Sequence, residues 1–186
     1  MNKTDLSKFD NDWYSPKAGI IKRGIWYLVN VVFFISPLLP LSSLKVFLLR
    51  LFGAKVGKGV IIKPAINIKY PWLLQIGDYS WLGENVWIDN LVEVEIGKHV
   101  CISQGAFLLC GNHNYKKSTF DLEVGKIKLD DGAWIGAKSI VCPGVTVGSH
   151  AVLAVGSIAT KDLEPYFIYQ GNPAVKVRER VISITN

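Results

Sequence analysis

Cysteine is scarce in this chain, and its spacing forms no framework. The 186 residues include three cysteines, Cys101, Cys110 and Cys142, and no CxxC pair. An odd number without paired spacing argues against a disulfide scaffold and against a cysteine metal cluster. We therefore expect small core or turn residues in a reducing compartment.

The chain also lacks an unbroken apolar run long enough to cross a membrane. Its most apolar segment, residues 25–41, reads IWYLVNVVFFISPLLPL and is interrupted by Ser36, Pro37 and Pro40. A transmembrane helix needs about 20 apolar residues, so this segment is too short. A secretory signal is also a poor match, because acidic residues precede the run and no small-residue cleavage site follows it.

Acidic residues are few in the N-terminal third. Residues 1–63 hold ten Lys and Arg against three acids, whereas the remainder holds eleven against twelve. The basic excess lies on an apolar N-terminal arm, which suits an anionic membrane surface better than a nucleic acid. The interleaved aromatic and basic residues of a nucleic-acid-binding module are absent, so we expect no nucleic-acid partner.

A helix is expected at the end of this arm. Four apolar residues recur at helical spacing between Ser43, a capping residue, and Gly53, a stop signal: Leu44, Phe47, Leu48 and Leu51. Two roles fit this stripe. It could cover the open first coil of the repeat described next, or it could anchor the protein at a membrane interface. The two roles are compatible, and the sequence leaves both open.

What the chain has in abundance is a period of six. Aliphatic residues recur at this interval in four runs: Val56, Ile62, Ile68; Ile76, Leu82, Ile88; Ile96, Ile102, Leu108; and Leu129, Ile135, Val141, Val147, Leu153, Ala159. The period is a signature of the parallel β-helix. Each unit makes one strand and one corner, three units close a coil, and coils stack about 4.8 Å apart. We predict an all-β domain over residues 55–164, an arm over 1–54 and a C-terminal extension over 165–186.

The interruptions of the period all follow the third unit of a coil, and therefore lie at one corner. The first two coils each carry two extra residues there, and the next carries fifteen, in a loop over residues 112–128. This loop begins with Asn112 and His113. Asp89 and Asn90 should lie about one coil below it, along the same edge.

The three histidines occupy two kinds of position. His99 and His150 stand at outward turns of regular units, where a solvent-exposed turn residue is expected. His113 instead opens the long loop. A neutral imidazole near pH 7 suits a general base that takes a proton from a hydroxyl or an amine, so we assign this role to His113.

Seven segments carry further motifs. They are GEN at 83–85, WIDN at 87–90, IGKHVCISQGAFL at 96–108, GNH at 111–113, DGAWIGAKSIVCPGVTVG at 131–148, ATKDLEP at 159–165 and GNPA at 171–174. Together they resemble the hexapeptide-repeat acyltransferases, most closely the exopolysaccharide O-acetyltransferases of the colanic-acid type. The resemblance implies a left-handed β-helix, a homotrimer with active sites between subunits, and no metal.

The resemblance also implies a reaction and its residues. Acetyl-CoA is the donor, His113 takes the proton from the acceptor hydroxyl, and that oxygen attacks the thioester without an acyl-enzyme. A hydrogen-bond donor stabilises the oxyanion that forms. The residues expected beside the acceptor are Asp89, Asn90, Asn112 and Trp134. The residues expected to bind the cofactor are Ala137, Val155, Thr160, Lys161, Lys176 and Arg178.

Simpler explanations exist for several of these residues. Ala137 and Val155, where related enzymes often carry Ser and Ala, could simply pack within the repeat. The basic residues of the cofactor-binding set could be solvent-exposed charged side chains instead of partners for the cofactor phosphates. Asn114 follows His113 where close relatives often have Asp, so the sequence does not tell which group orients the imidazole.

The sequence thus predicts an acetyl-CoA-dependent O-acetyltransferase in exopolysaccharide or other surface-polysaccharide biosynthesis. Its acceptor is a sugar hydroxyl, on a lipid-linked saccharide or a nucleotide sugar. We expect a cytoplasmic protein with peripheral contact to the inner face of the cytoplasmic membrane. A zinc enzyme of the gamma-class carbonic anhydrase kind would need three converging histidines, which this chain does not offer. The remaining alternative is a non-catalytic scaffold or membrane-surface adaptor, which would leave His113 unexplained.

Overall fold

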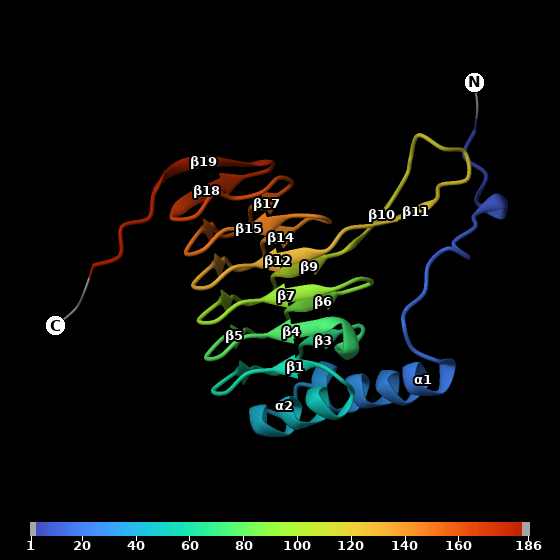
Figure 1. The fold of residues 1–186 in the computed structure, drawn as a ribbon, viewed down its shortest axis with the longest axis horizontal. Helices are drawn as coiled ribbons and strands as arrows, with labels where there is room; N and C mark the ends of the chain where they lie inside the picture. Colours follow the sequence, from blue (N-terminus) through green and yellow to red (C-terminus); the bar gives the residue numbers. More distant parts are fainter. Residues whose placement is uncertain (1–2, 184–186) are drawn as a thin grey trace.

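The computed structural model describes residues 3–183, in which three parallel sheets wind around a common core (Figure 1). Sheet A contains β1 (Lys55–Val56), β4 (Leu74–Ile76), β7 (Val94–Ile96), β12 (Ile127–Leu129) and β15 (Thr146–Val147). Sheet B contains β2 (Ile61–Ile62), β5 (Trp81–Leu82), β8 (Cys101–Ile102), β13 (Trp134–Ile135), β16 (Val152–Leu153), β18 (Phe167–Gly171) and β19 (Ala174–Glu179). Sheet C contains β3 (Asn67–Ile68), β6 (Trp87–Asp89), β9 (Phe107–Leu109), β14 (Ile140–Val141) and β17 (Ile158–Ala159).

The core consists of the aliphatic residues of the period, which confirms the predicted β-helix. They are buried in every coil: Ile62, Ile68, Ile76, Leu82, Ile88, Ile96, Ile102, Leu108, Leu129, Ile135, Val141, Val147, Leu153 and Ala159. Equivalent residues stack from coil to coil, as Ile62, Leu82 and Ile102 do in sheet B. Val56, in the first coil, is only half-buried, because it lies at the end of the stack.

The corner histidines lie where the sequence predicts. His99 and His150 have φ values of 55° and 58°, in the left-handed region that turns the chain from one sheet to the next. Their rings stack on tyrosines of neighbouring coils, with centroids 5.3 Å apart for Tyr79 and His99 and 4.8 Å for His150 and Tyr166. These contacts make both histidines structural corner residues.

The long loop is a hairpin that leaves the β-helix at one corner. Strand β10 (Gly111–His113) pairs antiparallel with β11 (Leu122–Val124) before the chain rejoins sheet A at β12. At the far end of the β-helix, β18 continues sheet B in parallel with β16, and β19 folds back antiparallel on β18. The sheet therefore runs past residue 164; the three-part division of the chain stays a prediction.

Helices lie across the other end, below the first coil (Figure 1). Helix α1 (Ile20–Val29) continues as the π-helix η2 (Asn30–Ile35), and α2 (Ser42–Leu51) follows. Short 3-10 turns lie at η1 (Leu6–Lys8) and η3 (Pro71–Leu73). Gly53, with φ of 103°, follows α2 as predicted, but Leu41 rather than Ser43 occupies the N-cap position. Within residues 3–183, no helix is both long and apolar enough to cross a membrane.

The predicted stripe of α2 is divided, since Leu48 packs partly against the core while other members of the stripe face outward. The residues that α2 buries are Lys45 and Leu49, whereas Phe47 and Leu51 are 59% and 65% exposed. The reason is the open edge of the first coil, whose backbone groups need hydrogen-bond partners. Lys45 Nζ donates to the Lys63 carbonyl at 2.9 Å, so the buried face of α2 carries a lysine beside Leu49.

Other polar side chains complete this cover. Ser42 Oγ accepts from the Ile62 amide at 2.9 Å, and Trp26 Nε1 of α1 donates to the Ile68 carbonyl at the same distance. Arg50 donates to the carbonyls of Val56 and Gly57. The helical end thus satisfies backbone groups with side chains and leaves most of its apolar residues outside.

Candidate active site

His113 lies at the end of β10, where the hairpin departs from the β-helix. Its Nδ1 is 2.9 Å from the carbonyl oxygen of Phe120, across the hairpin, and its ring stacks on the Phe120 ring with centroids 4.4 Å apart. A carbonyl oxygen only accepts, so the proton of a neutral imidazole resides on Nδ1 and leaves Nε2 as an acceptor. The Phe120 carbonyl, and not the side chain of Asn114, therefore orients the imidazole.

The pocket beside His113 brings together part of the predicted acceptor set. Asp89, Asn112 and His113 line one cavity of about 770 Å³, as their shared edge predicts. Asp89 is 9% exposed, and Lys69 Nζ donates to its Oδ1 at 2.9 Å. The pocket therefore holds an imidazole acceptor, a carboxylate and amide groups within one chain, which are the groups that bind and deprotonate a polyol.

Asn90 has a different environment. Its side chain is completely buried, Oδ1 accepts from the Tyr70 amide at 3.0 Å, and Nδ2 donates to the Tyr70 carbonyl at 2.6 Å. Both amide atoms are therefore engaged in holding the extra residues of the coil below. Asp89, and not Asn90, therefore lines the pocket beside His113.

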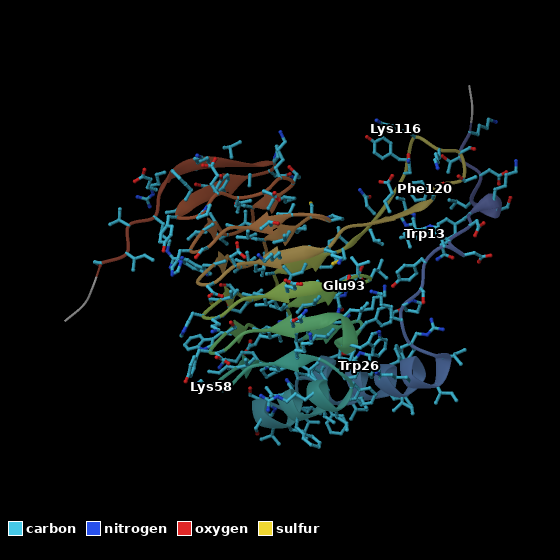
Figure 2. The ribbon with its side chains drawn as sticks, in the orientation of Figure 1. Trp13, Trp26, Lys58, Glu93, Lys116 and Phe120 are labelled. Atoms are coloured by element: carbon cyan, nitrogen blue, oxygen red, sulfur yellow. The ribbon has the colours of Figure 1, made fainter. Side chains whose placement is uncertain are left out.

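The N-terminal strap, residues 3–17, forms a wall of the pocket that the sequence did not reveal. Phe9, Asn11 and Tyr14 line the cavity, and the rings of Phe9 and His113 lie 5.8 Å apart. Figure 2 shows the strap, with Trp13 labelled, on the same side of the molecule as Phe120 of the hairpin. No pattern in the sequence connects a polar N-terminal segment to a loop about a hundred residues away.

Specific contacts hold the strap in place. The Asp5 amide donates to the Ser118 carbonyl at 2.8 Å, and Tyr14 Oη donates to the Leu91 carbonyl at 2.8 Å. Lys17 Nζ bonds Glu93 at 2.6 Å, and this bond lowers the pKa of Glu93 to about 2. Burial raises the pKa of Tyr14 above its ordinary value of 10, which keeps the phenol protonated as a donor.

The residues predicted for the cofactor lie elsewhere in the chain, and none of them lines the His113 pocket. Trp134, which the sequence predicts beside the acceptor, does not line this pocket either; on β13 it is 45% exposed and donates from Nε1 to Ser103 Oγ at 2.9 Å. Ala137 and the 71% exposed Val155 lie at the corner between sheets B and C, whereas the hairpin leaves from the corner between C and A. One chain alone therefore does not bring Ala137 and Val155 to His113.

The basic residues of the predicted cofactor set lie toward the C-terminal end. Thr160 and Lys161 are exposed just after β17, and Arg178 is exposed on β19. Lys176 bonds Glu164 at 2.7 Å and lies 4.0 Å above the Phe167 ring. Arg178 and Lys161 show no ion pair among the described residues, whereas Lys176 already has one.

The cysteines show no sign of nucleophilic chemistry. All three are free thiols, and burial raises the pKa of Cys110, which lies near the pocket, to about 12. A thiol with so high a pKa is a poor nucleophile at neutral pH. Over residues 3–183 there is also no group of three or more His, Cys, Asp or Glu side chains arranged to hold a metal ion.

A larger cavity lies away from these residues. It measures about 910 Å³ and runs along the outer surface of sheet A, past Lys55, Gln75, Glu95 and Lys128. It contains none of the predicted site residues. The geometry of hydrogen-bond acceptors favours the smaller pocket beside His113 as the chemical site.

Comparisons with known proteins agree with this architecture. The chain is 38% identical over 177 residues to the "Putative colanic acid biosynthesis acetyltransferase WcaF" of Escherichia coli K12, covering 95% of this chain and 97% of that protein. It is 29% identical over 135 residues to the galactoside O-acetyltransferase of Escherichia coli K12, covering 71% and 66% of the two chains. No family model matches the chain.

Solved structures share the fold. A hexapeptide-repeat acetyltransferase of Vibrio cholerae, complexed with acetyl coenzyme A, superposes with a TM-score of 0.75 at 21% identity, covering 87% of each chain. A galactoside acetyltransferase in complex with coenzyme A also gives a TM-score of 0.75, at 25% identity, covering 86% of this chain and 80% of that one. These matches confirm the predicted fold class, the left-handed parallel β-helix.

Proposed function

The chain belongs to the hexapeptide-repeat acetyltransferases, and we propose that it transfers the acetyl group of acetyl-CoA to a sugar hydroxyl in surface-polysaccharide biosynthesis. The observation that carries the proposal is the His113 geometry. Nδ1 is held by the Phe120 carbonyl, so the free Nε2 can accept a proton in a pocket that also contains Asp89 and Asn112.

The chemistry follows from that geometry. The acceptor hydroxyl donates a hydrogen bond to Nε2 of His113, and the imidazole takes its proton as the oxygen attacks the thioester carbonyl. The resulting imidazolium keeps its Nδ1–H on the Phe120 carbonyl. The tetrahedral intermediate then collapses, the C–S bond breaks, and the coenzyme A thiolate recovers the proton from Nε2. General-base catalysis of this kind contributes about 10²–10⁴-fold.

A trimer would complete the site. Ala137 and Val155 lie at a different corner from His113, so a cofactor bound along their corner must reach His113 of a neighbouring subunit. The relatives crystallised with acetyl coenzyme A or coenzyme A support the choice of cofactor. On this proposal Thr160, Lys161 and Arg178 face the cofactor groove, with the basic side chains near its phosphates, and Trp134 lines the cleft on the acceptor side.

We also propose that the helical end lies on an anionic membrane. The outer helical face comprises twelve large apolar residues that are at least 39% exposed: Ile20, Ile21, Ile25, Tyr27, Leu28, Val31, Val32, Ile35, Leu38, Leu41, Phe47 and Leu51. On α1 and η2 these residues lie opposite the buried Trp26 and Phe34. Exposed apolar residues in this number, carried by the helices at one end of the molecule, indicate an interaction surface.

The positive charge of the helical end favours an anionic membrane as the partner of this surface. Residues 13–77, which include both long helices and the first coil, contain nine Lys and Arg and no acid. Five of the nine are exposed and have no ion pair among the described residues: Lys22, Arg50, Lys55, Lys58 and Lys63. Figure 2 shows Lys58 at the outer end of the first coil, near α2. Each basic residue near an anionic surface is worth about 1 kcal/mol.

Cyclic symmetry makes this orientation consistent with a trimer. All subunits of a cyclic assembly point the same way along its axis. Three helical ends would therefore face one bilayer, on the cytoplasmic side where acetyl-CoA is available. Flotation with vesicles tests this orientation. Binding to anionic vesicles that weakens with salt supports it, and a protein that binds neither anionic nor neutral vesicles contradicts it.

The enzymatic proposal is tested by mixing the protein with acetyl-CoA and a panel of glycosides and lipid-linked saccharides. Coenzyme A release that depends on the glycoside, together with a product that carries one added acetyl ester, is the expected result. A non-catalytic scaffold would release coenzyme A no faster than spontaneous thioester hydrolysis. Sedimentation equilibrium tests the trimer, because a monomer at micromolar concentration contradicts a site shared between subunits.

A further inference from the structure

Arg23 of α1 has a hydrogen-bonding requirement that the folded chain does not meet. Its Nε is buried and is the one such side-chain nitrogen or oxygen without a partner among residues 3–183. Its guanidinium also has no ion pair within this part of the chain. A buried donor without an acceptor costs free energy, so an arginine in this state suggests a binding partner that is absent here.

The position of Arg23 connects two cavities. One is the His113 pocket, and the other is a cavity of about 380 Å³ between α1, η2 and the first two coils. Both are lined by the same four residues: Arg23, Lys69, Tyr70 and Asp89. A molecule whose hydroxyl reaches His113 could therefore extend past Arg23 into the second cavity.

The charge at this junction is positive. Lys69 is paired with Asp89 at 2.9 Å, and Arg23 has no carboxylate partner among the described residues. The nearest part of the sequence offers none, since residues 13–77 contain no acid. Two cations therefore face one anion at the point where the cavities meet. Guanidinium groups match phosphate oxygens in geometry as well as in charge.

We infer that Arg23, assisted by Lys69, binds a phosphate or diphosphate group of the acceptor. The inference rests on the proposed function and names the acceptor class: a saccharide joined through phosphate to a carrier. The sugar would lie against Asp89 and His113, with the phosphate at Arg23.

The second cavity favours a prenyl carrier over a nucleotide. Its further lining includes the apolar or aromatic residues Trp26, Tyr27, Ile35 and Trp87, together with Asn30 and Asn67, whose side chains bond to each other at 2.8 Å. Tyr27 is 66% exposed and Ile35 is 40% exposed, and both belong to the outer helical face. A prenyl chain that follows this cavity from Arg23 would emerge at the surface proposed to face the bilayer.

The test is calorimetric titration of the full chain with three probes at saturating coenzyme A: geranyl diphosphate, UDP and the neutral alcohol geraniol. Coenzyme A occupies its own phosphate-binding residues, so only other sites are measured. We expect geranyl diphosphate to bind and geraniol to bind at least about 10-fold more weakly, since a charge-assisted hydrogen bond contributes about 1.5–3 kcal/mol. Tighter binding of geranyl diphosphate than of UDP indicates the prenyl carrier, and the reverse order indicates a nucleotide carrier and overturns the role of the second cavity.

Variants locate the site. Arg23→Gln should raise the Kd for geranyl diphosphate about 10-fold or more, and Arg23→Lys should recover part of that loss. Lys22→Gln removes the same charge from the adjacent, exposed position and should change the Kd less than about twofold. Because Nε of Arg23 is unsatisfied, Arg23→Gln should leave Tm equal or higher, which separates a binding role from a structural one.

Two results would overturn the inference: unchanged binding in Arg23→Gln, or equal losses in Arg23→Gln and Lys22→Gln, which would reflect general charge attraction only. Coenzyme A binding, measured separately, distinguishes this failure from failure of the proposed function. A chain that does not bind coenzyme A at all contradicts the transferase proposal. The phosphate titration can still be read on it without coenzyme A.

Discussion

The repeating coils and the segments that depart from them differ in what determines the role of a residue. In the coils, a residue's place in the period decides its role: from Ile62 onward the aliphatic residues of the period are buried, and His99 and His150 serve as stacked corners. The hairpin, the strap and the helical end follow no such period. The histidine of the hairpin, His113, lines a pocket instead of stacking at a corner. The repeat supplies the buried core, whereas the proposed chemistry and the proposed membrane attachment both lie in segments that interrupt or precede it.

The largest effect expected from this comparison concerns the histidines. His113→Ala should reduce acetyl transfer about 10²–10⁴-fold, the usual loss when a general base is removed. Tm should change little, because the ring is at the base of an exposed hairpin. Initial rates at saturating acetyl-CoA measure the loss.

His99→Ala and His150→Ala are the matched controls. Both should keep transfer rates near those of the unmodified chain, because their rings stack on Tyr79 and Tyr166 and neither lines the His113 pocket. Equal losses in all three variants would erase the distinction between corner and interruption.

A core substitution tests the opposite side of the comparison. Leu82→Ala removes a fully buried residue of the period and should lower the free energy of unfolding by about 2–5 kcal/mol. The rate per folded molecule, measured well below Tm, should stay near that of the unmodified chain. Tyr115→Ala in the hairpin, where the side chain is 75% exposed, is the control and should shift stability by less than about 0.5 kcal/mol.

The same contrast explains what the sequence could predict. Burial repeats every six residues, so the coils, their corners and the edge shared by Asp89 and His113 follow from local spacing. The strap does not, because its place depends on contacts such as Lys17 with Glu93, which join residues far apart in the chain. The identity of residue 114 could not predict the orientation of His113. The orienting group is the backbone carbonyl of Phe120, which no pattern of side chains indicates.

The helical end shows what apolar spacing alone leaves open. The spacing of Leu44, Phe47, Leu48 and Leu51 correctly predicted a helix, but it did not tell which residues of that helix are buried. An apolar stripe normally faces the core, but the first coil exposes backbone donors and acceptors, and Lys45 and Ser42 satisfy them. The need for hydrogen bonds at an open sheet edge therefore decided which face of α2 turns inward.

A smaller effect is expected at the outer helical face. The double variant Ile25→Ser with Leu28→Ser should weaken partition to anionic vesicles about 10-fold or more, because each apolar side chain loses part of the roughly 1.5–3 kcal/mol of full burial. Both positions are more than half exposed, so Tm should hold.

The opposite end of the β-helix supplies the control. Val175 and Val177 of β19 are 60% and 54% exposed, yet β19 covers its end of the coil with backbone hydrogen bonds and carries charged neighbours. Val175→Ser with Val177→Ser should leave vesicle binding unchanged. If both double variants lose binding equally, attachment is not specific to the helical end.

The smallest effect concerns the strap and pH. The Glu93 carboxylate has its pKa lowered from an ordinary 4.5 to about 2, chiefly by the bond from Lys17. A lowered folded-state pKa means that the docked strap is favoured above about pH 4.5 and loses that contribution as the pH falls toward 2. Hydrogen exchange of residues 3–17 should therefore be constant from pH 8 to 5, after correction for intrinsic rates, and should rise below about 4.5.

Lys17 is well exposed, so the pair is worth only about 0.2–1 kcal/mol. Lys17→Met should raise strap exchange by no more than about fivefold at neutral pH and flatten most of its acid dependence, while Lys126 retains a weaker contact with Glu93. An acid dependence as steep in Lys17→Met as in the unmodified chain would show that another group fastens the strap.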